Sequence, residues 1–97
     1  MGAGGVPNRA VEIINGKRGD LPTSKALPNS RYDLYVNETK VQSRWFDYKG
    51  NVVRNRDYIH QDAHHNHSFP HDHMWSWDKG YPERNPTNLE PNYDDFN

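Results

Sequence analysis

The sequence predicts an α+β fold in which a short N-terminal helix accompanies a small antiparallel meander sheet. An apolar stretch with helical spacing lies near the N-terminus, and three strand-like runs follow it. The connections between these runs are too short for parallel pairing, so we expect the strands to be antiparallel. Only 32% of the residues are apolar, which predicts a modest core built on large aromatic side chains.

The predicted helix occupies residues 6–14. Pro7 suits the first turn of a helix, and Asn15 with Gly16 is a typical stop. Residues 16–30 are rich in Gly, Pro, Ser and basic side chains, and are predicted to form an ordered loop. The apolar residues with helical spacing are Val6, Ala10, Val11, Ile13 and Ile14.

The predicted meander has strands at residues 31–36, 39–47 and 52–60, separated by turn-forming residues. Side chains alternate along the second and third strands, so that Asp57 and Arg56 are expected on opposite faces. The third strand runs directly into a histidine-rich segment.

The C-terminal part is predicted to be less regular. Pro70 cannot donate a backbone hydrogen bond to a sheet, so residues 61–73 are expected to form a loop that returns to the sheet near residues 74–77. Residues 80–97 are predicted to be an extended acidic tail, held by Tyr81, Leu89, Tyr93 and Phe96. The chain is expected to be one domain with three parts: residues 1–30 (helix and basic loop), 31–77 (sheet and histidine-rich segment) and 78–97 (tail).

The composition excludes some kinds of chemistry. The chain has no cysteine, hence no disulfide framework and no thiolate nucleophile. No run approaches the ~18 apolar residues of a membrane-spanning helix, and no signal peptide is recognisable. No glycine-rich phosphate loop is present. The glycine-rich start, residues 1–5, is typical of a domain excised from a longer protein.

Charge is distributed unevenly along the chain. Residues 1–56 contain ten basic and five acidic residues, a balance of +5, whereas residues 57–97 contain two basic and eight acidic residues, a balance of −6. The basic half could supply a phosphate-binding face, while the net charge of −1 alone would argue against a nucleic-acid partner. The simpler alternative to a phosphate-binding face is that these charged side chains are solvated and that their charges average out along the chain.

The histidines are the strongest functional signal. All six lie within fourteen residues, and core packing alone does not explain such a cluster. Histidine changes charge near neutral pH, transfers protons and ligates metals as the neutral imidazole. The six are His60, His64, His65, His67, His71 and His73.

Two kinds of chemistry fit these histidines. As a zinc site, His71 and His73 would point to one side of an extended segment, and His67 could be a third ligand. The HExxH motif of many zinc hydrolases is absent. As metal-free machinery, one histidine would deprotonate a 2′-hydroxyl of RNA and another would protonate the leaving 5′-oxygen. A histidine-rich surface loop with incidental metal affinity is the non-functional alternative.

Other polar residues would assist this chemistry. Asp57 could orient a histidine and fix its tautomer, or it could be a strand-edge aspartate paired with an arginine. The three tryptophans could stack on nucleobases, although such residues are more often core. The arginines expected near the histidines, as candidates for stabilising charge on a phosphate, are Arg44, Arg54 and Arg56.

Three segments carry a resemblance to a known family. They are residues 44–47 (RWFD) with Gly50, residues 57–60 (DYIH), and residues 67–73 (HSFPHDH). Together they resemble the C-terminal toxin domains of bacterial polymorphic toxins, including those of contact-dependent growth inhibition. The resemblance covers residues 31–75, and the first segment departs from the family pattern mildly, by its Trp–Phe pair.

The resemblance implies a small metal-independent ribonuclease with the barnase, EndoU, colicin and RelE type of fold, which cleaves tRNA. It implies delivery by a larger secreted or cell-surface effector into a target bacterial cytoplasm, a cognate immunity protein, and in some relatives a need for elongation factor Tu. Carried over to this sequence, the catalytic candidates are Arg44, Asp57, His60, His67, His71 and His73, and the RNA-binding candidates are Arg54, Arg56 and Lys49.

Three hypotheses therefore follow from the sequence. The first is a metal-independent ribonuclease toxin that uses no cofactor. The second is a zinc-dependent nuclease with His67, His71 and His73 as ligands. The third is a non-catalytic binding module with a pH-sensitive histidine loop.

Overall fold

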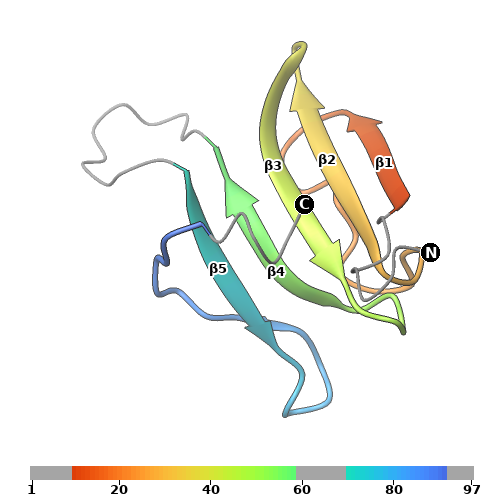
Figure 1. Cartoon of the computed structure of the whole chain (residues 1–97), viewed down its shortest axis with the longest axis vertical. Coiled ribbons are helices and arrows are strands. Elements are labelled where there is room, and N and C mark those ends of the chain that lie inside the picture. The colour runs from red at the N-terminus through yellow and green to blue at the C-terminus, as the bar shows by residue number, and fades with distance from the viewer. Residues whose placement is uncertain (1–9, 59–69, 92–97) are drawn as a thin grey trace, which may run out of the picture.

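The described part of the chain forms one six-stranded mixed sheet. The structure is a computed structural model, and it describes residues 10–58 and 70–91. The strands follow one another across the sheet in the order in which they occur in the sequence (Figure 1). They are β1 (Ala10–Asn15), β2 (Ser30–Val36), β3 (Thr39–Phe46), β4 (Val52–Asp57), β5 (His71–Ser76) and β6 (Glu83–Arg84).

The predicted α+β fold class is wrong, because the segment expected to form a helix is a strand. Residues 10–15 form β1, which pairs in parallel with β2, and no helix occurs within residues 10–58 and 70–91. Val11, Ile13 and Ile14 are β-branched, and such side chains fit a pleated surface better than a helix. Residues 16–29 form the long crossover that parallel pairing requires. The fold is therefore essentially all-β, and none of the described segments is a helix long and apolar enough to span a membrane.

The predicted meander is confirmed in β2, β3 and β4. These strands pair antiparallel, and they begin and end within a few residues of the predicted limits. Asn37 and Glu38, which connect β2 to β3, both have positive φ values, of 50° and 67°, as a tight hairpin turn requires. Gly50, between β3 and β4, has a φ of 78°, and a Cβ there would collide with the backbone of Ala26. The second turn therefore needs its glycine.

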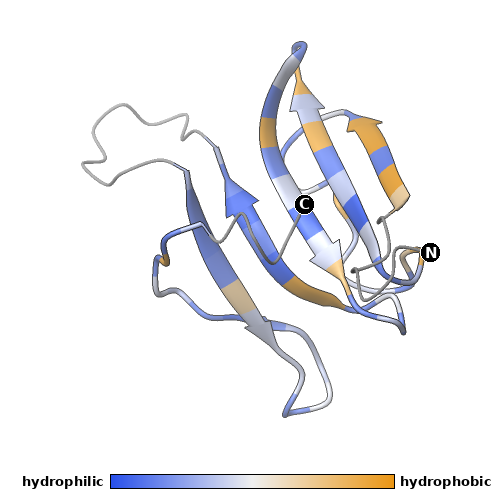
Figure 2. Cartoon of the chain, in the orientation of Figure 1, coloured by the Kyte–Doolittle hydropathy of each residue, from blue (hydrophilic) through white to orange (hydrophobic). Residues whose placement is uncertain are grey.

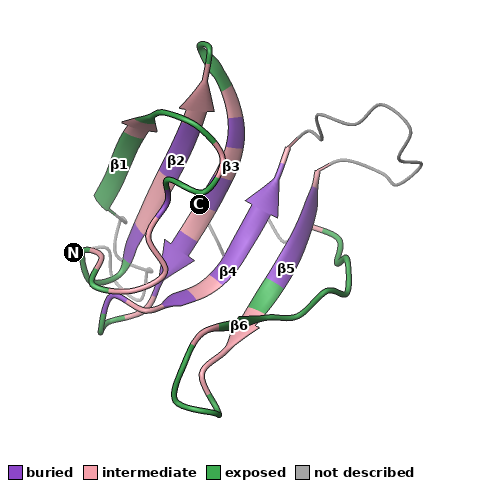
Figure 3. Ribbon diagram, turned by 180° about the vertical axis from the view of Figure 1, so that it is seen from behind, coloured by how far each residue is buried: buried purple, intermediate pink, exposed green. Residues whose placement is uncertain are grey.

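The C-terminal segment is more regular than predicted. Strand β5 begins at His71, so residues 71–73 belong to the sheet and not to the expected loop. Beyond it, β6 pairs with residues 75–76, and Leu89 exchanges two backbone hydrogen bonds with Asp72, of 2.8 and 2.9 Å. Within residues 81–91, backbone pairing therefore holds β6 and Leu89 to β5, and β6 is labelled beside β5 in Figure 3. Tyr93 and Phe96 lie outside the described residues.

The apolar core lies at the β2–β3 side of the sheet, where it is covered by the crossover. Its buried centre is Leu21 from the crossover with Leu34 and Val41 from the sheet. By contrast, β4 and β5 are largely hydrophilic (Figure 2), and yet much of both strands is buried (Figure 3). Buried polar side chains are therefore concentrated in these two strands, and seven of them lie within residues 54–57 and 71–73: Arg54, Asn55, Arg56, Asp57, His71, Asp72 and His73.

Candidate functional site

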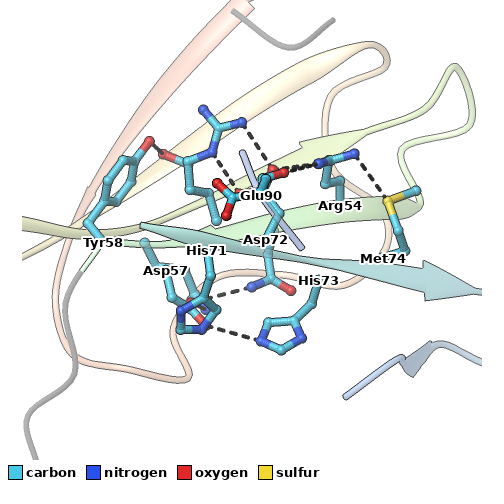
Figure 4. Close-up of polar contacts among 12 residues, drawn as sticks. Arg54, Asp57, Tyr58, His71, Asp72, His73, Met74 and Glu90 are labelled. Atoms are coloured by element: carbon cyan, nitrogen blue, oxygen red, sulfur yellow. Dashed lines mark hydrogen bonds and ion pairs between the residues drawn. The ribbon is translucent and has the colours of Figure 1, made fainter. Parts of the chain in front are cut away.

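The pairing of β4 with β5 brings a carboxylate and two histidines together. Asp57 lies opposite His71, and Asn55 lies opposite His73. Residues two apart in a strand share a face, so Asp57, His71 and His73 project to the same side of the sheet (Figure 4). We call these three residues the Asp–His–His centre.

The Asp–His–His centre is compact and shielded from solvent. The Oδ2 atom of Asp57 lies 3.5 Å from Nε2 of His71 and 3.8 Å from Nε2 of His73. The two imidazole rings meet edge to face, with centroids 5.1 Å apart. The exposed fractions of Asp57, His71 and His73 are 5%, 4% and 4%. The charged states of these groups are therefore poorly solvated.

A hydrogen bond fixes the tautomer of His73. Its Nδ1 lies 2.9 Å from the backbone carbonyl oxygen of Asn85. A carbonyl can only accept, so Nδ1 carries the proton and, in the neutral ring, Nε2 carries a lone pair. Burial is the main cause that lowers the pKa of His73, and Arg84 and His71 lower it further, whereas the Asn85 bond and Asp57 raise it. The neutral form is thereby favoured, with its lone pair on the side of Asp57.

The second oxygen of Asp57 is held by amide groups. Gln42 of β3 donates its Nε2–H to Oδ1 at 2.8 Å, and Asn55 donates its Nδ2–H to the same atom at 3.3 Å. Asn55 is held in turn by the indole N–H of Trp75, which donates to its Oδ1 at 2.6 Å. These bonds orient the carboxylate so that Oδ2 faces the histidines.

Arg44 lies on the same face of the sheet, because it pairs with Asn55 across β3 and β4. Its Nη1 donates to the carbonyl oxygens of Leu21 and Pro22, both at 3.0 Å, and its guanidinium lies 5.1 Å from the ring centroid of Trp75. The buried Nε has no hydrogen-bond partner. Burial lowers the pKa of Arg44, and the nearby Asp57 carboxylate partly offsets this effect. The sequence predicted Arg44 as a site residue; the structure places it on the same sheet face as the Asp–His–His centre, and its role there stays a prediction.

Arg54 and Arg56 lie on the opposite face of the sheet from His71 and His73, as Figure 4 shows for Arg54. Arg54 donates from Nε to Asp72 at 2.6 Å, and Arg56 donates to the same carboxylate from Nε at 2.8 Å and from Nη2 at 3.0 Å. All three residues are buried. We call them the Arg–Asp–Arg cluster. Strand alternation, which puts neighbours in sequence on opposite faces, therefore separates these arginines from His71 and His73, and their role in RNA binding stays a prediction.

The remaining predicted site residues lie elsewhere. Lys49 is exposed in the turn before β4, whereas Asp57 is at the far end of that strand, about 20 Å away at ~3.3 Å per residue. His60 lies outside the described residues, and so does His67, the third ligand of the predicted His67–His71–His73 zinc site. Trp45 is buried as a core residue at 1% exposure, while Trp75 and Trp77 are half-buried.

Sequence reasoning missed Arg84 and Asn85, which it assigned to the tail. Arg84 pairs with Trp75 on the same sheet face, and its charge lowers the pKa of both His73 and Arg44. An available signal was that Arg84 is one of only two basic residues after position 56. Both missed residues also line an open cleft of about 250 Å³, together with Ser76, Glu83 and Pro86.

Comparison with known proteins adds no relative: no protein-family model, no curated protein and no solved structure matches this chain. The resemblance to toxin nucleases therefore stays a prediction, and the functional argument rests on the geometry of the Asp–His–His centre.

Proposed function

We propose that this protein is a ribonuclease whose active centre is the Asp–His–His centre. The observation that carries the proposal is the convergence of Asp57, His71 and His73, drawn from two strands onto one buried face. Two imidazoles and a carboxylate can exchange protons with a substrate without any cofactor. Two arginines near them, Arg44 and Arg84, suit a substrate with a phosphate group.

In the proposed reaction, His73 is the general base and His71 the general acid. Nε2 of His73 accepts the proton of a ribose 2′-hydroxyl, and the 2′-oxygen forms a bond to phosphorus. The bond from phosphorus to the 5′-oxygen breaks, and His71 gives that oxygen a proton. The products are a 2′,3′-cyclic phosphate and a free 5′-hydroxyl. Neutral His73 suits the first role, since only an unprotonated nitrogen can accept the proton.

The arginines and Asp57 have supporting roles in this proposal. Arg44 and Arg84 stabilise the negative charge that builds up on the phosphate oxygens during the transfer. The Asn85 carbonyl orients His73, and Asp57 favours the protonated form of the histidine that has just accepted a proton. Because His71 and His73 are only 4% exposed, the substrate is expected to reach them from the cleft beside Arg84.

The choice of tRNA as substrate comes from the resemblance to polymorphic toxins. The same resemblance leads us to propose that a larger effector delivers the domain into a bacterial cytoplasm, that a cognate immunity protein blocks the centre, and that elongation factor Tu presents the tRNA. The basic balance of residues 1–56, +5, is compatible with an RNA partner.

The test is cleavage of total bacterial tRNA by the purified chain in EDTA, with and without elongation factor Tu, followed by mapping of the cut ends. We expect cuts that leave 2′,3′-cyclic phosphates, and we expect His73→Gln to lower the rate at least about 100-fold. Lys17→Gln, which removes an exposed charge in the crossover, is the control and should cleave normally. Intact RNA under all conditions, with a folded protein, would contradict the proposal.

A further inference from the structure

Three metal-ligand atoms converge in the Asp–His–His centre. One ring nitrogen of His71, one ring nitrogen of His73 and one carboxylate oxygen of Asp57 all lie within 4.8 Å of one another. Two imidazole nitrogens and a carboxylate oxygen form a ligand set typical of zinc and related divalent metals. Ligands of a tetrahedral zinc ion, bound at ~2.0–2.1 Å, are ~3.3–3.5 Å apart. The two Asp57–histidine distances, 3.5 and 3.8 Å, are close to that separation.

The groups around these ligands are arranged as they are around metal sites. A histidine that binds a metal generally donates its other ring N–H to a carbonyl or a carboxylate, and His73 donates to the Asn85 carbonyl. The ligating carboxylate is generally held by hydrogen bonds as well, and Gln42 and Asn55 hold Asp57. These outer contacts leave Nε2 of His73 and Oδ2 of Asp57 directed into the centre.

The electrostatics of the centre favour a cation. In the neutral tautomer, the lone pair of His73 Nε2 and the Oδ2 atom of Asp57 are both electron-rich, and they lie 3.8 Å apart in a buried setting. Two acceptors that face each other with little solvent are unfavourable unless a proton or a metal ion lies between them. Histidine ligands disfavour Mg²⁺, which prefers oxygen ligands and retains several waters.

We propose that Asp57, His71 and His73 bind one zinc-like divalent transition-metal ion, and that this ion inhibits the ribonuclease reaction. Binding itself needs only the three ligands, with water in the fourth position. Inhibition rests on the proposed function: a metal on Nε2 of His73 occupies the lone pair that would accept the proton of the 2′-hydroxyl. The metal therefore competes with catalysis for the same atom.

The binding test is calorimetric titration of the full metal-free chain with Zn²⁺ and, separately, with Mg²⁺. We expect one tight Zn²⁺ equivalent and no Mg²⁺ binding at the same concentrations. His73→Gln and Asp57→Asn should each weaken this equivalent at least tenfold. The double variant His64→Gln/His65→Gln controls for other histidines of the chain and should retain it. No tight Zn²⁺ equivalent, or one lost only in the control, would overturn the metal site.

The activity test adds Zn²⁺ to the tRNA cleavage reaction. We expect one equivalent of bound Zn²⁺ to suppress cleavage, and excess EDTA to restore it. Cleavage that requires Zn²⁺ would overturn the inhibition and the metal-free mechanism, while leaving the metal site intact. Cleavage by a chain that does not bind Zn²⁺ would leave the proposed function intact and overturn the metal site. The two proposals therefore fail in distinguishable ways.

Discussion

The two faces of the β4–β5 pair both bury an aspartate, but they surround it with different partners. On one face, Asp72 is fully buried and accepts three hydrogen bonds from Arg54 and Arg56. On the other face, Asp57 receives amide hydrogen bonds on one oxygen, and its second oxygen faces two imidazole nitrogens at 3.5 and 3.8 Å. The same residue type thus has positively charged partners on one face and titratable ones on the other.

This difference separates a structural role from a chemical one. A buried carboxylate that is paired with two guanidiniums has its charge compensated, and removal of one partner leaves buried charge uncompensated. The Asp57 carboxylate faces two imidazoles, a group that can transfer protons or ligate a metal. We therefore propose that the Arg–Asp–Arg cluster stabilises the fold, whereas the Asp–His–His centre carries the proposed reaction. The predictions below compare the two faces by matched substitutions.

The largest expected effect is the loss of stability on replacing the carboxylate of the Arg–Asp–Arg cluster. Asp72→Asn removes a buried charge that accepts three hydrogen bonds from two buried guanidiniums, so the free energy of unfolding should fall by about 3–5 kcal/mol. Urea unfolding measures this change. The control Asp78→Asn, at an exposed position in the turn after β5, should change it by less than about 0.5 kcal/mol. A loss below about 1 kcal/mol for Asp72→Asn would contradict the structural role.

The same substitution on the other face should give the reverse pattern. In Asp57→Asn, the side-chain oxygen can still accept from Gln42 and Asn55, while the charge beside the histidines is removed. We expect tRNA cleavage to fall about 100-fold, with a change in unfolding free energy of less than about 1 kcal/mol. Steady-state cleavage and urea unfolding of one preparation measure both. If Asp57→Asn unfolds the protein as Asp72→Asn does, the division between the two faces is wrong.

A smaller effect is expected at Arg84, the exposed cation beside the cleft. Its proposed contact is with a substrate phosphate, so Arg84→Gln should weaken productive RNA binding about tenfold, which corresponds to ~1.4 kcal/mol. We expect this as a rise in KM for tRNA that becomes smaller at high salt. Lys79→Gln removes a neighbouring exposed charge and is the matched control. Equal effects from both variants would point to general electrostatics instead of a specific contact.

The smallest effect is expected at Gln42, which orients Asp57 from β3. Gln42→Met keeps the size of the side chain but removes the 2.8 Å hydrogen bond, so kcat should fall about fivefold, corresponding to ~1 kcal/mol. Zinc affinity should fall by about tenfold, since outer partners orient metal ligands. A positioning role predicts both changes without a comparable loss in unfolding free energy. A stability loss with unchanged zinc affinity would make Gln42 merely structural.

The fold could be predicted where the local pattern was unambiguous. The meander of β2, β3 and β4 follows from alternating side chains and turn residues, which act over a few positions. The N-terminal segment could not be read in this way, because Val11, Ile13 and Ile14 suit either period in so short a stretch. The parallel pairing of β1 with β2 makes this segment a strand and not a helix. That pairing depends on a crossover that local spacing does not reveal.

The sequence predicted which types of residue form the candidate site, but it did not predict which individual residues come together there. The clustering of histidines indicated His71 and His73 as site candidates, and the predicted strand before the cluster indicated Asp57. Alternation along β4 already implied that Arg54 and Arg56 face away from Asp57. Arg84 could not be placed, because its position depends on the pairing of β6 with β5.

By itself, the sequence determined the chemistry available to this protein: six histidines in one segment, no thiol, and strands whose successive side chains lie on alternate faces. Tertiary structure alone decided which of these groups meet. Strand register sets Asp57 opposite His71, and the alternation of faces separates this pair from Asp72 and its arginines. The physical reason is that side chains of a sheet interact across strands, over distances in sequence at which local propensity carries no information.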